Sequence, residues 1–306
     1  MEIDFTSLDV AEKLAALESN SIVGPTSLVQ RVEDARGRKC EGIPTPWAKL
    51  KDDFALRPSE LVMLGGYSGH FKSSVSAQIS LQALAMGKTV GIASLELPAE
   101  DVVELYAEIA YGGMEPPINY VSRFAQWCEG RFHIYDRVDA IQPEDAVALT
   151  YHMAVNQGCD LIVLDALMMM GVCDDLERER KFTQMLASVA KRFNVCILLV
   201  HHMRKPQGLH GEERPPGKYD FVGSGHLVNI AMSVVIVWHN KKKASQKASG
   251  GEYDDDEPDL VIHVAKQRHH RFEGRVGLWQ HDNCRAFCST SKRHLVKFDL
   301  FSEAAA

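Results

Sequence analysis

Residues 61–74 read Leu-Val-Met-Leu-Gly-Gly-Tyr-Ser-Gly-His-Phe-Lys-Ser-Ser. The apolar run Leu61–Gly66 predicts a short buried strand, and residues 73–86 after it have the pattern of a helix. A strand, a glycine-rich turn and a helix that begins with Lys and Ser or Thr are typical of a phosphate-binding loop. The turn amides of such a loop face the phosphates, the lysine reaches the β- and γ-phosphates, and the hydroxyl holds Mg²⁺. This stretch therefore favours a nucleotide-binding α/β fold over a chance glycine turn before a helix.

One position departs from the pattern G-x-x-x-x-G-K-S, because Phe71 stands where the last glycine is expected. A small residue there lets the backbone approach the β-phosphate closely. We therefore expect Phe71 to weaken nucleotide affinity or turnover, and Gly69 to compensate in part by shifting the turn. The candidate nucleotide-binding residues are Gly66, Ser68, Gly69, His70, Phe71, Lys72, Ser73 and Ser74.

Two later strands end in carboxylates. The apolar run 161–165 ends at Asp165, and the run 89–94 leads directly to Glu96. The carboxyl ends of parallel strands meet at one edge of a sheet, so both carboxylates are expected beside the phosphate loop. There Asp165 would hold the Mg²⁺ shell together with Ser73, and Glu96 would be the base that orients water for attack on the γ-phosphate.

Strand and helix patterns alternate outward from this loop. Such alternation implies a parallel sheet covered by helices on both faces. After residue 230 the patterns are those of strands alone. The expected fold class is therefore α/β, with a mainly parallel central sheet, helices on both faces and added antiparallel strands near the C-terminus. The expected helices are 73–86, 99–110, 143–156 and 175–193, and the expected strands are 61–66, 89–94, 132–135, 161–165, 195–200, 234–238, 260–265, 275–279 and 295–298.

Composition restricts the class of protein. The 306 residues are 45% hydrophobic and 25% charged, which excludes disorder as the main state. No apolar run approaches the ~20 residues of a membrane span, and the N-terminus has no secretory signal, so we expect a cytoplasmic protein without membrane partners. Seven cysteines without a Cys-x-x-Cys pair predict reduced thiols rather than disulfides or a zinc ribbon. A net charge of −7 confines any nucleic-acid contact to part of the surface.

The N-terminal region is expected to be separate from the nucleotide-binding core. Residues 6–19 have the apolar stripe and the capping pattern of a short helix, which would pack on its own domain or on a neighbouring subunit. Gly24-Pro25 breaks the chain, and residues 26–41 read as a polar helix or linker. We therefore divide the chain into an N-terminal helix and linker, residues 1–41, and an ATPase domain, residues 42–306. Two long polar segments, 203–220 and 240–259, are expected as surface loops, the second as a hairpin tip.

An ordered series of motifs resembles the RecA-type ATPase domain of the DnaB-like (superfamily 4) ring helicases, in particular the phage and mitochondrial branch. The resemblance covers roughly residues 42–299, and it implies a RecA-like P-loop core. Each motif alone is weakly specific, whereas the set in this order is specific. The segments that carry it are Gly42–Trp47, Ser94–Glu100, Leu161–Met170, His201–Pro206, Gly223–Gly225 and Ala265–Arg268, the last of which reads Ala-Lys-Gln-Arg.

Carried over residue by residue, the resemblance implies a hexameric, ATP-dependent replicative-type helicase that uses Mg²⁺ and moves on single-stranded DNA. Its implied catalytic residues are Glu96, His202 as a sensor of the γ-phosphate, and Arg268 with Lys266 as a finger that reaches the neighbouring subunit's nucleotide. Arg271 is the alternative finger. A separate primase or polymerase is a possible partner. The candidate DNA-binding residues are Arg204, Lys205, Arg214 and Lys218.

Alternatives remain at this point. His201 and His202 are also compatible with a strand-end pair that is satisfied by backbone carbonyls. A metal site formed by His201, His202 and His210 lacks an acidic or cysteine ligand at suitable spacing. At the level of function, a DNA-binding or helicase-loading ATPase without unwinding activity is the main rival. A RecA-like signalling ATPase that does not bind DNA is a second rival, which the basic loop and the Ala-Lys-Gln-Arg motif disfavour.

Overall fold

The computed structural model describes residues 24–40, 42–173, 175–204, 206, 211–223, 225–298 and 300. The chain divides into two units, residues 1–41 and 42–306. In the first unit the described part consists of the 3-10 turn η2 (Pro25–Leu28) and helix α2 (Val29–Cys40). The helix predicted over residues 6–19 lies outside the described residues. Among the helices that the structure describes, none has both the length and the apolar character needed to cross a membrane.

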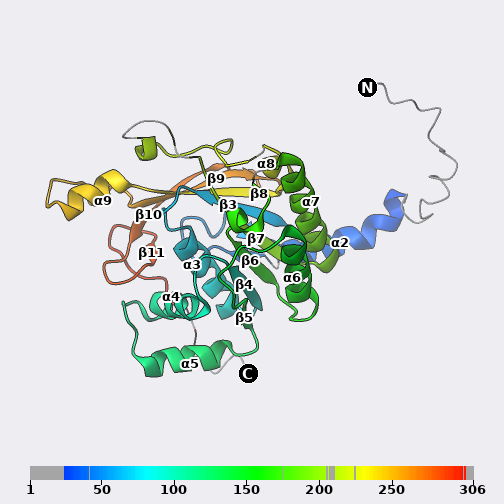
Figure 1. Ribbon diagram of the computed structural model, residues 1–306, viewed down its shortest axis with the longest axis horizontal. Coiled ribbons are helices and arrows are strands. Elements are labelled where there is room, and N and C mark those ends of the chain that lie inside the picture. The colour runs from blue at the N-terminus through cyan, green and yellow to red at the C-terminus, as the bar shows by residue number, and fades with distance from the viewer. Residues whose placement is uncertain are drawn as a thin grey trace. The chain divides into compact units, whose positions relative to one another are not determined.

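The second unit is built on one large mixed sheet (Figure 1), whose strand order is β11-β10-β9-β8-β3-β7-β6-β4-β5. The six strands from β8 to β5 in that order are parallel, whereas β9, β10 and β11 are antiparallel to their neighbours. A separate antiparallel pair, β1 (Ile43–Pro44) and β2 (Ala55–Leu56), precedes the sheet. The sheet strands are β3 (Leu61–Gly66), β4 (Val90–Ser94), β5 (Phe132–Ile134), β6 (Leu161–Asp165), β7 (Cys196–His202), β8 (Ser233–His239), β9 (Leu260–Gln267), β10 (Gly274–Gln280) and β11 (Phe287–Cys288).

Helices cover both faces of the sheet, which confirms the predicted class. Every residue of β3 is buried, and its side chains alternate between two cores. Val62 and Leu64 face the core that contains α3 (Lys72–Ala85), α4 (Ala99–Tyr111) and α5 (Ile118–Cys128). Leu61 and Met63 face the opposite core. That second core contains α6 (Pro143–Val155), α7 (Leu176–Phe193) and α8 (His226–Ile230).

Three details differ from the sequence-based expectation. The strand predicted over 295–298 is wrong: this segment has no regular structure, and its apolar residues pack against the core as a covering segment. The segment 240–259 is not a bare hairpin tip, because it begins with helix α9 (Lys241–Ala248), which projects from the sheet in Figure 1. The side chain of Asn240 caps α9, accepting a hydrogen bond from the Lys243 amide at 3.1 Å. Helix α5 was not predicted.

Candidate active site

The glycine-rich turn joins β3 to α3 at the carboxyl edge of the parallel strands. Gly69 (φ +73°) and Phe71 (φ +60°) both adopt the left-handed backbone conformation, and α3 begins directly after Phe71. No side chain caps the first turn of α3, so its amides are left for a ligand, and the helix N-terminus favours an anion there. A Cβ atom at Gly66 would lie 2.7 Å from the Val237 carbonyl oxygen, so that position needs glycine. The turn thus has the form of a phosphate cradle.

Phe71 takes the backbone conformation that glycine adopts at no steric cost, and its side chain points into protein. Its ring meets the ring of His239 edge-on at a centroid distance of 4.8 Å and the ring of Phe287 at 5.3 Å. A left-handed conformation costs a residue with a Cβ atom on the order of 1–2 kcal/mol. Aromatic packing against β8 and β11 offsets this cost, so the ring has a place in the fold of the turn.

His70 ties the same turn to two other parts of the chain. The amide of His239 donates a hydrogen bond to Nδ1 of His70 at 3.0 Å, and Nε2 of His70 lies 3.6 Å from the carboxylate of Glu212. Glu212 also pairs with Lys241 of α9. Burial lowers the pKa of His70 to about 4, with Lys241 acting in the same direction. The hydroxyl of Tyr67 donates to the backbone oxygen of Arg214 at 3.4 Å, so the segment 211–214 is held against the turn.

Lys72 is a buried cation at the first position of α3. Its Nζ donates to the Tyr67 carbonyl oxygen at 3.0 Å and to Nδ1 of His202 at 3.4 Å. Burial lowers the pKa of the ammonium group, while the nearby carboxylates of Asp165 and Glu96 raise it. The cation is therefore held inside the turn, in the position expected of a lysine that binds phosphate.

Ser73 and Asp165 meet, as the strand-end argument predicted. The hydroxyl of Ser73 donates to Oδ2 of Asp165 at 2.8 Å. Burial raises the pKa of the Asp165 carboxyl, and the hydrogen bond from Ser73 opposes this shift. A hydroxyl oxygen beside a carboxylate, both close to the cradle, is the oxygen donor set that fits Mg²⁺. The residues present therefore fit the metal that the phosphate loop implies.

Glu96 and His202 also come together, from β4 and β7. Nε2–H of His202 donates to Oε1 of Glu96 at 3.3 Å, and Nδ1 of the same ring accepts from Lys72. The hydrogen bond from His202 lowers the pKa of Glu96, and Lys72 adds to the effect. His201 differs from its neighbour, because its Nε2–H donates to the Val222 carbonyl oxygen at 2.8 Å. The strand-end alternative thus describes His201, whereas His202 joins the cluster of charged groups.

The residues of the Ala-Lys-Gln-Arg motif lie at the opposite edge of the sheet. The Arg268 amide donates to the Met232 carbonyl oxygen at 3.2 Å, beside the start of β8, whereas His70 contacts His239 at the end of β8. The ammonium group of Lys266 donates to the carbonyl oxygens of Val228 and Ala231, each at 2.6 Å, and burial lowers its pKa to about 8.

Arg268 is exposed, and its Nη2 donates to the Asn229 carbonyl oxygen at 3.0 Å. Cations at the carbonyl end of a helix are favourable, so both side chains hold the end of α8. Arg271, the alternative finger, is exposed nearby in the sequence. The structure does not bring Lys266 or Arg268 to the cradle of their own chain.

Three of the candidate DNA-binding residues lie on the described part of the segment between β7 and α8, and Lys205 lies outside the described residues. Arg204 and Arg214 are exposed, and Lys218 is half-buried. Nζ of Lys218 lies 5.7 Å from the ring centroid of Tyr219, whose side chain is 73% exposed. This segment therefore presents cations and an aromatic ring to solvent.

Sequence reasoning missed the residues that support the turn from a distance. His239, Phe287 and Glu212 contact the turn from β8, β11 and the segment after β7. The separation of His70 and His239 is 169 positions, and no local pattern predicts a pairing over that distance. The one available signal was the unusual His-Phe pair inside the loop, which called for partners in the fold.

Comparisons with known proteins agree with this geometry. Residues 42–288 match the family described as the DnaB-like helicase C-terminal domain. The chain belongs to this family. It is 27% identical over 284 residues to a DNA helicase/primase of Enterobacteria phage T3, a match that covers 85% of this chain and 47% of the phage protein. The chain therefore spans about half the length of that relative.

Two solved structures share the fold at low sequence identity. A solved ATPase domain of another protein matches with a TM-score of 0.66 and 13% identity, covering 86% of this chain and 96% of that one. A DnaB-like replicative helicase, whose structure was studied for its interactions with primase, matches with a TM-score of 0.67 and 13% identity. That match covers 91% of this chain and 70% of the helicase chain. The RecA-like fold of the DnaB-like ATPase domains is thus confirmed.

Proposed function

We propose that this protein is an ATP-dependent replicative-type DNA helicase, a motor that moves on single-stranded DNA. The observation that carries the proposal is the convergence of Lys72, the Ser73–Asp165 pair and the Glu96–His202 pair at one edge of a RecA-like sheet. Membership of the DnaB-like family supports the same conclusion, because DnaB-like helicases act on DNA.

The residues have separate tasks in this proposal. The amides of the turn and the ammonium group of Lys72 bind the phosphates, and Ser73 and Asp165 hold Mg²⁺, which when bound neutralises charge that develops on the phosphates. Glu96 accepts the proton of the attacking water at its carboxylate. His202 lies between Lys72 and Glu96, so its hydrogen bonds report the presence of a γ-phosphate.

Arg268 is assigned in this proposal to the nucleotide of an adjacent subunit. Its location at the opposite edge of the sheet supports action in trans, because the side chain is too far from its own cradle. Lys266 is buried against the end of α8 and would hold the segment that carries Arg268. We therefore propose a closed homo-oligomer, a hexamer, in which each interface completes one site.

Contact with single-stranded DNA is assigned to the segment between β7 and α8. Arg204, Arg214 and Lys218 would contact phosphates, and Lys205 belongs to the same proposed set. A few cations per subunit, repeated around a ring, line a channel despite the net charge of −7. A separate primase or polymerase is the proposed partner, and the cytoplasm of a bacterial or phage-infected cell is the proposed location.

The test is strand displacement from a forked duplex by the purified chain, with ATP and Mg²⁺, beside a measurement of oligomeric state. We expect unwinding that requires ATP and hydrolysis that single-stranded DNA stimulates. DNA-stimulated hydrolysis by a ring without strand displacement would favour a loading or DNA-binding ATPase instead. Hydrolysis that does not respond to DNA would contradict both functions.

A further inference from the structure

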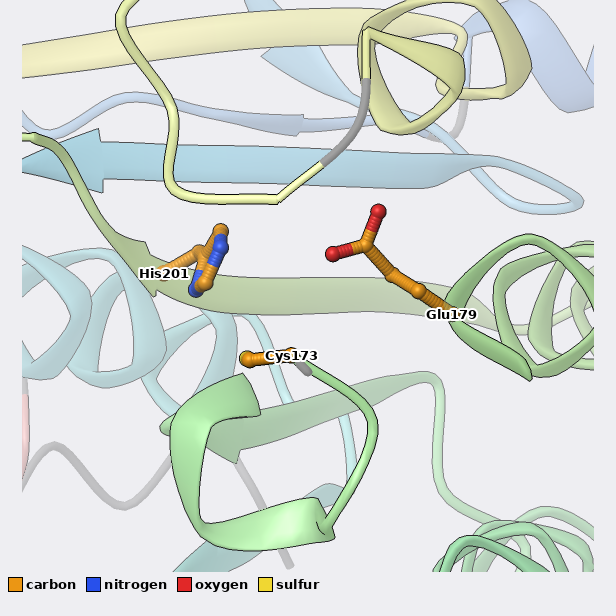
Figure 2. A group of neighbouring side chains, drawn as sticks. All are labelled: Cys173, Glu179 and His201. Carbon is orange, nitrogen blue, oxygen red and sulfur yellow. The ribbon is translucent and has the colours of Figure 1, made fainter. Parts of the chain in front are cut away.

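Three potential metal ligands meet on the second-core side of the sheet, outside the proposed nucleotide site (Figure 2). Cys173 lies in the segment after the 3-10 turn η3 (Leu167–Met170), Glu179 on α7 and His201 on β7. One donor atom of each, sulfur, carboxylate oxygen and ring nitrogen, lies within 4.8 Å of the other two. Glu179 and His201 are fully buried, and Cys173 is half-buried. Residues 173 to 201 are spread over 28 positions, so sequence spacing did not reveal this cluster.

His201 is oriented like a metal ligand. Its Nε2–H donates to the Val222 carbonyl oxygen at 2.8 Å, and its ring stacks on Phe221 at an interplanar angle of 12°. Nδ1 of His201 is buried, and within the described part of the chain it has no hydrogen-bond partner. Metal-binding histidines commonly donate their second ring N–H to a carbonyl in this way, which fixes the tautomer and leaves a lone pair for the metal. Burial lowers the pKa of His201 to about 4, so the ring is neutral, as metal binding requires.

The backbone also closes around the other two ligands. A Cβ atom at Gly223, where φ is +88°, would lie 1.9 Å from Oε2 of Glu179, so the chain passes directly over this carboxylate and only glycine fits. The thiol of Cys173 faces the Leu167 carbonyl oxygen at 3.9 Å. These contacts restrict the side chains before any ion arrives, which lowers the entropic cost of binding.

We propose that Cys173, Glu179 and His201 bind a divalent cation of the zinc class. Thiolate, imidazole and carboxylate together are donors that suit Zn²⁺ and disfavour Mg²⁺. Tetrahedral zinc places its ligand atoms about 3.5 Å apart, so the donors draw in by at most about 1.3 Å. Cys173 loses its proton to solvent on binding. One thiolate and one carboxylate then balance the two positive charges, and water takes the fourth position.

The ion would join parts of the chain that border the proposed ATPase site. Cys173 follows the strand that ends at Asp165, and His201 is the residue before His202. Occupancy would fix the segment after β6 against the end of β7, and through Val222 and Gly223 it would fix the approach to α8. The site is thus a structural support beside the γ-phosphate sensor, and it is independent of nucleotide binding.

The experiment uses the full chain, stripped by a chelator, dialysed and titrated with Co²⁺ in excess Mg²⁺. We expect one Co²⁺ per chain, a near-ultraviolet absorption band from thiolate-to-cobalt charge transfer, and loss of that band on adding Zn²⁺. Zn²⁺ is also expected to raise the Tm of the stripped protein, because it binds only the folded site. Absence of bound Co²⁺ at micromolar concentration, or binding without the band, would overturn the proposal.

Variants assign the ligands. Cys173→Ser should abolish the charge-transfer band and the Zn²⁺-dependent rise in Tm. Glu179→Gln and His201→Gln should each weaken Co²⁺ binding by more than the roughly 10- to 100-fold that loss of a supporting partner costs.

Cys128→Ser is the matched control, since the Cys128 thiol also faces a backbone carbonyl, at 3.5 Å, but lies in the opposite core. A band that survives Cys173→Ser, or that Cys128→Ser removes, would show that the ligands are wrong. Cys173→Ser is a near-isosteric change at a half-buried position, so it decides the matter even if a buried variant fails to fold.

Discussion

Glu96 and His202 hold each other in place through a single hydrogen bond of 3.3 Å. That bond lowers the pKa of Glu96 and keeps it ionised as a base. Glu96→Gln retains the shape and the hydrogen-bonding reach of the side chain but cannot accept a proton. We expect a loss of ATP turnover of about 10²–10⁴-fold, the usual contribution of a general base.

Nucleotide affinity in Glu96→Gln should be unchanged, because Lys72 and the amides of the turn remain. Steady-state hydrolysis and binding of a fluorescent nucleotide, measured on the same preparation, separate the two effects. Loss of affinity would place Glu96 in phosphate binding rather than in proton transfer.

His70 makes the folding stability of the domain sensitive to acid. Its pKa is lowered to about 4 in the fold and is near 6.5 in an unfolded chain, so the unfolded state takes up the proton first as the pH falls. Stability is therefore full above about pH 6.5 and declines toward pH 4, by at most about 1.4 kcal/mol per pH unit from this group. The groups that face His70 are His239, Glu212, Lys241 and Tyr67.

The variant His70→Asn keeps an acceptor for the amide of His239 and cannot titrate. We expect its denaturant midpoint to fall less steeply between pH 6.5 and 4.5 than that of the unchanged protein, with nucleotide absent from both. Parallel slopes would show that other groups, such as His239, dominate the acid response. At pH 7.5 the two proteins should differ only by the constant cost of the substitution.

Phe71 calls for a revised expectation once its surroundings are known. The sequence suggested an obstacle to phosphate, whereas the ring packs on His239 and Phe287. Phe71→Gly removes the backbone cost of about 1–2 kcal/mol but also removes an aromatic side chain whose burial contributes about 1.5–3 kcal/mol. We expect slightly lower thermal stability with equal or tighter ATP binding. Abolished nucleotide binding would mean that the ring has a positive role at the site.

At the scale of elements, the segment 211–214 links the phosphate cradle to the proposed DNA-binding segment. Glu212 pairs with both His70 and Lys241, and the backbone of Arg214 accepts from Tyr67. Glu212→Gln removes the charge that holds these pairs together. We expect basal hydrolysis to stay within about twofold, while its stimulation by single-stranded DNA falls several-fold, because exposed pairs of this kind contribute only about 0.2–1 kcal/mol. Glu252→Gln, an exposed carboxylate on a distant loop, is the control. Unchanged stimulation in Glu212→Gln would show that the link does not transmit DNA binding.

The elements near the loop were predictable because their signals are local. Strand β3, helix α3 and the strand-end carboxylate Asp165 follow from apolar runs, a Lys-Ser helix start and the rule that parallel strands end at one edge. Helix α9 was not predicted, because its support comes from Asn240 and from the buried pair Lys243–Asp259 at 3.0 Å, which is a tertiary contact.

The cluster of Cys173, Glu179 and His201 was missed for a similar reason. Each residue belongs to a different element, and the spacing between them matches no metal-binding motif. The apolar residues around 295–298 misled in the opposite direction, since burial alone produced the pattern of a strand. Long-range contacts thus account for both kinds of error.

At the scale of the whole molecule, the sheet sets the distance between Arg268 and the cradle. Strand β8 begins beside Arg268 and ends beside His70, and the six steps from Ser233 to His239 span about 20 Å. An arginine side chain cannot cover that length. If Arg268 stabilises charge on a γ-phosphate, that phosphate must belong to a different subunit. Such a residue contributes about 10³–10⁵ in rate in nucleotide hydrolases.

Arg268→Ala should therefore nearly abolish hydrolysis while ATP binding persists, because Lys72 and the turn amides are intact. Mixing tests the direction of action: Arg268→Ala subunits combined with Glu96→Gln subunits should recover part of the activity. At an interface where an intact Glu96 faces an intact Arg268, one complete site exists although every subunit is defective. An arginine acting within its own chain would give no recovery, since each chain lacks either its base or its arginine. Absent recovery, in rings shown by mass measurement to have mixed, would transfer the role to Arg271 or exclude a site shared between subunits.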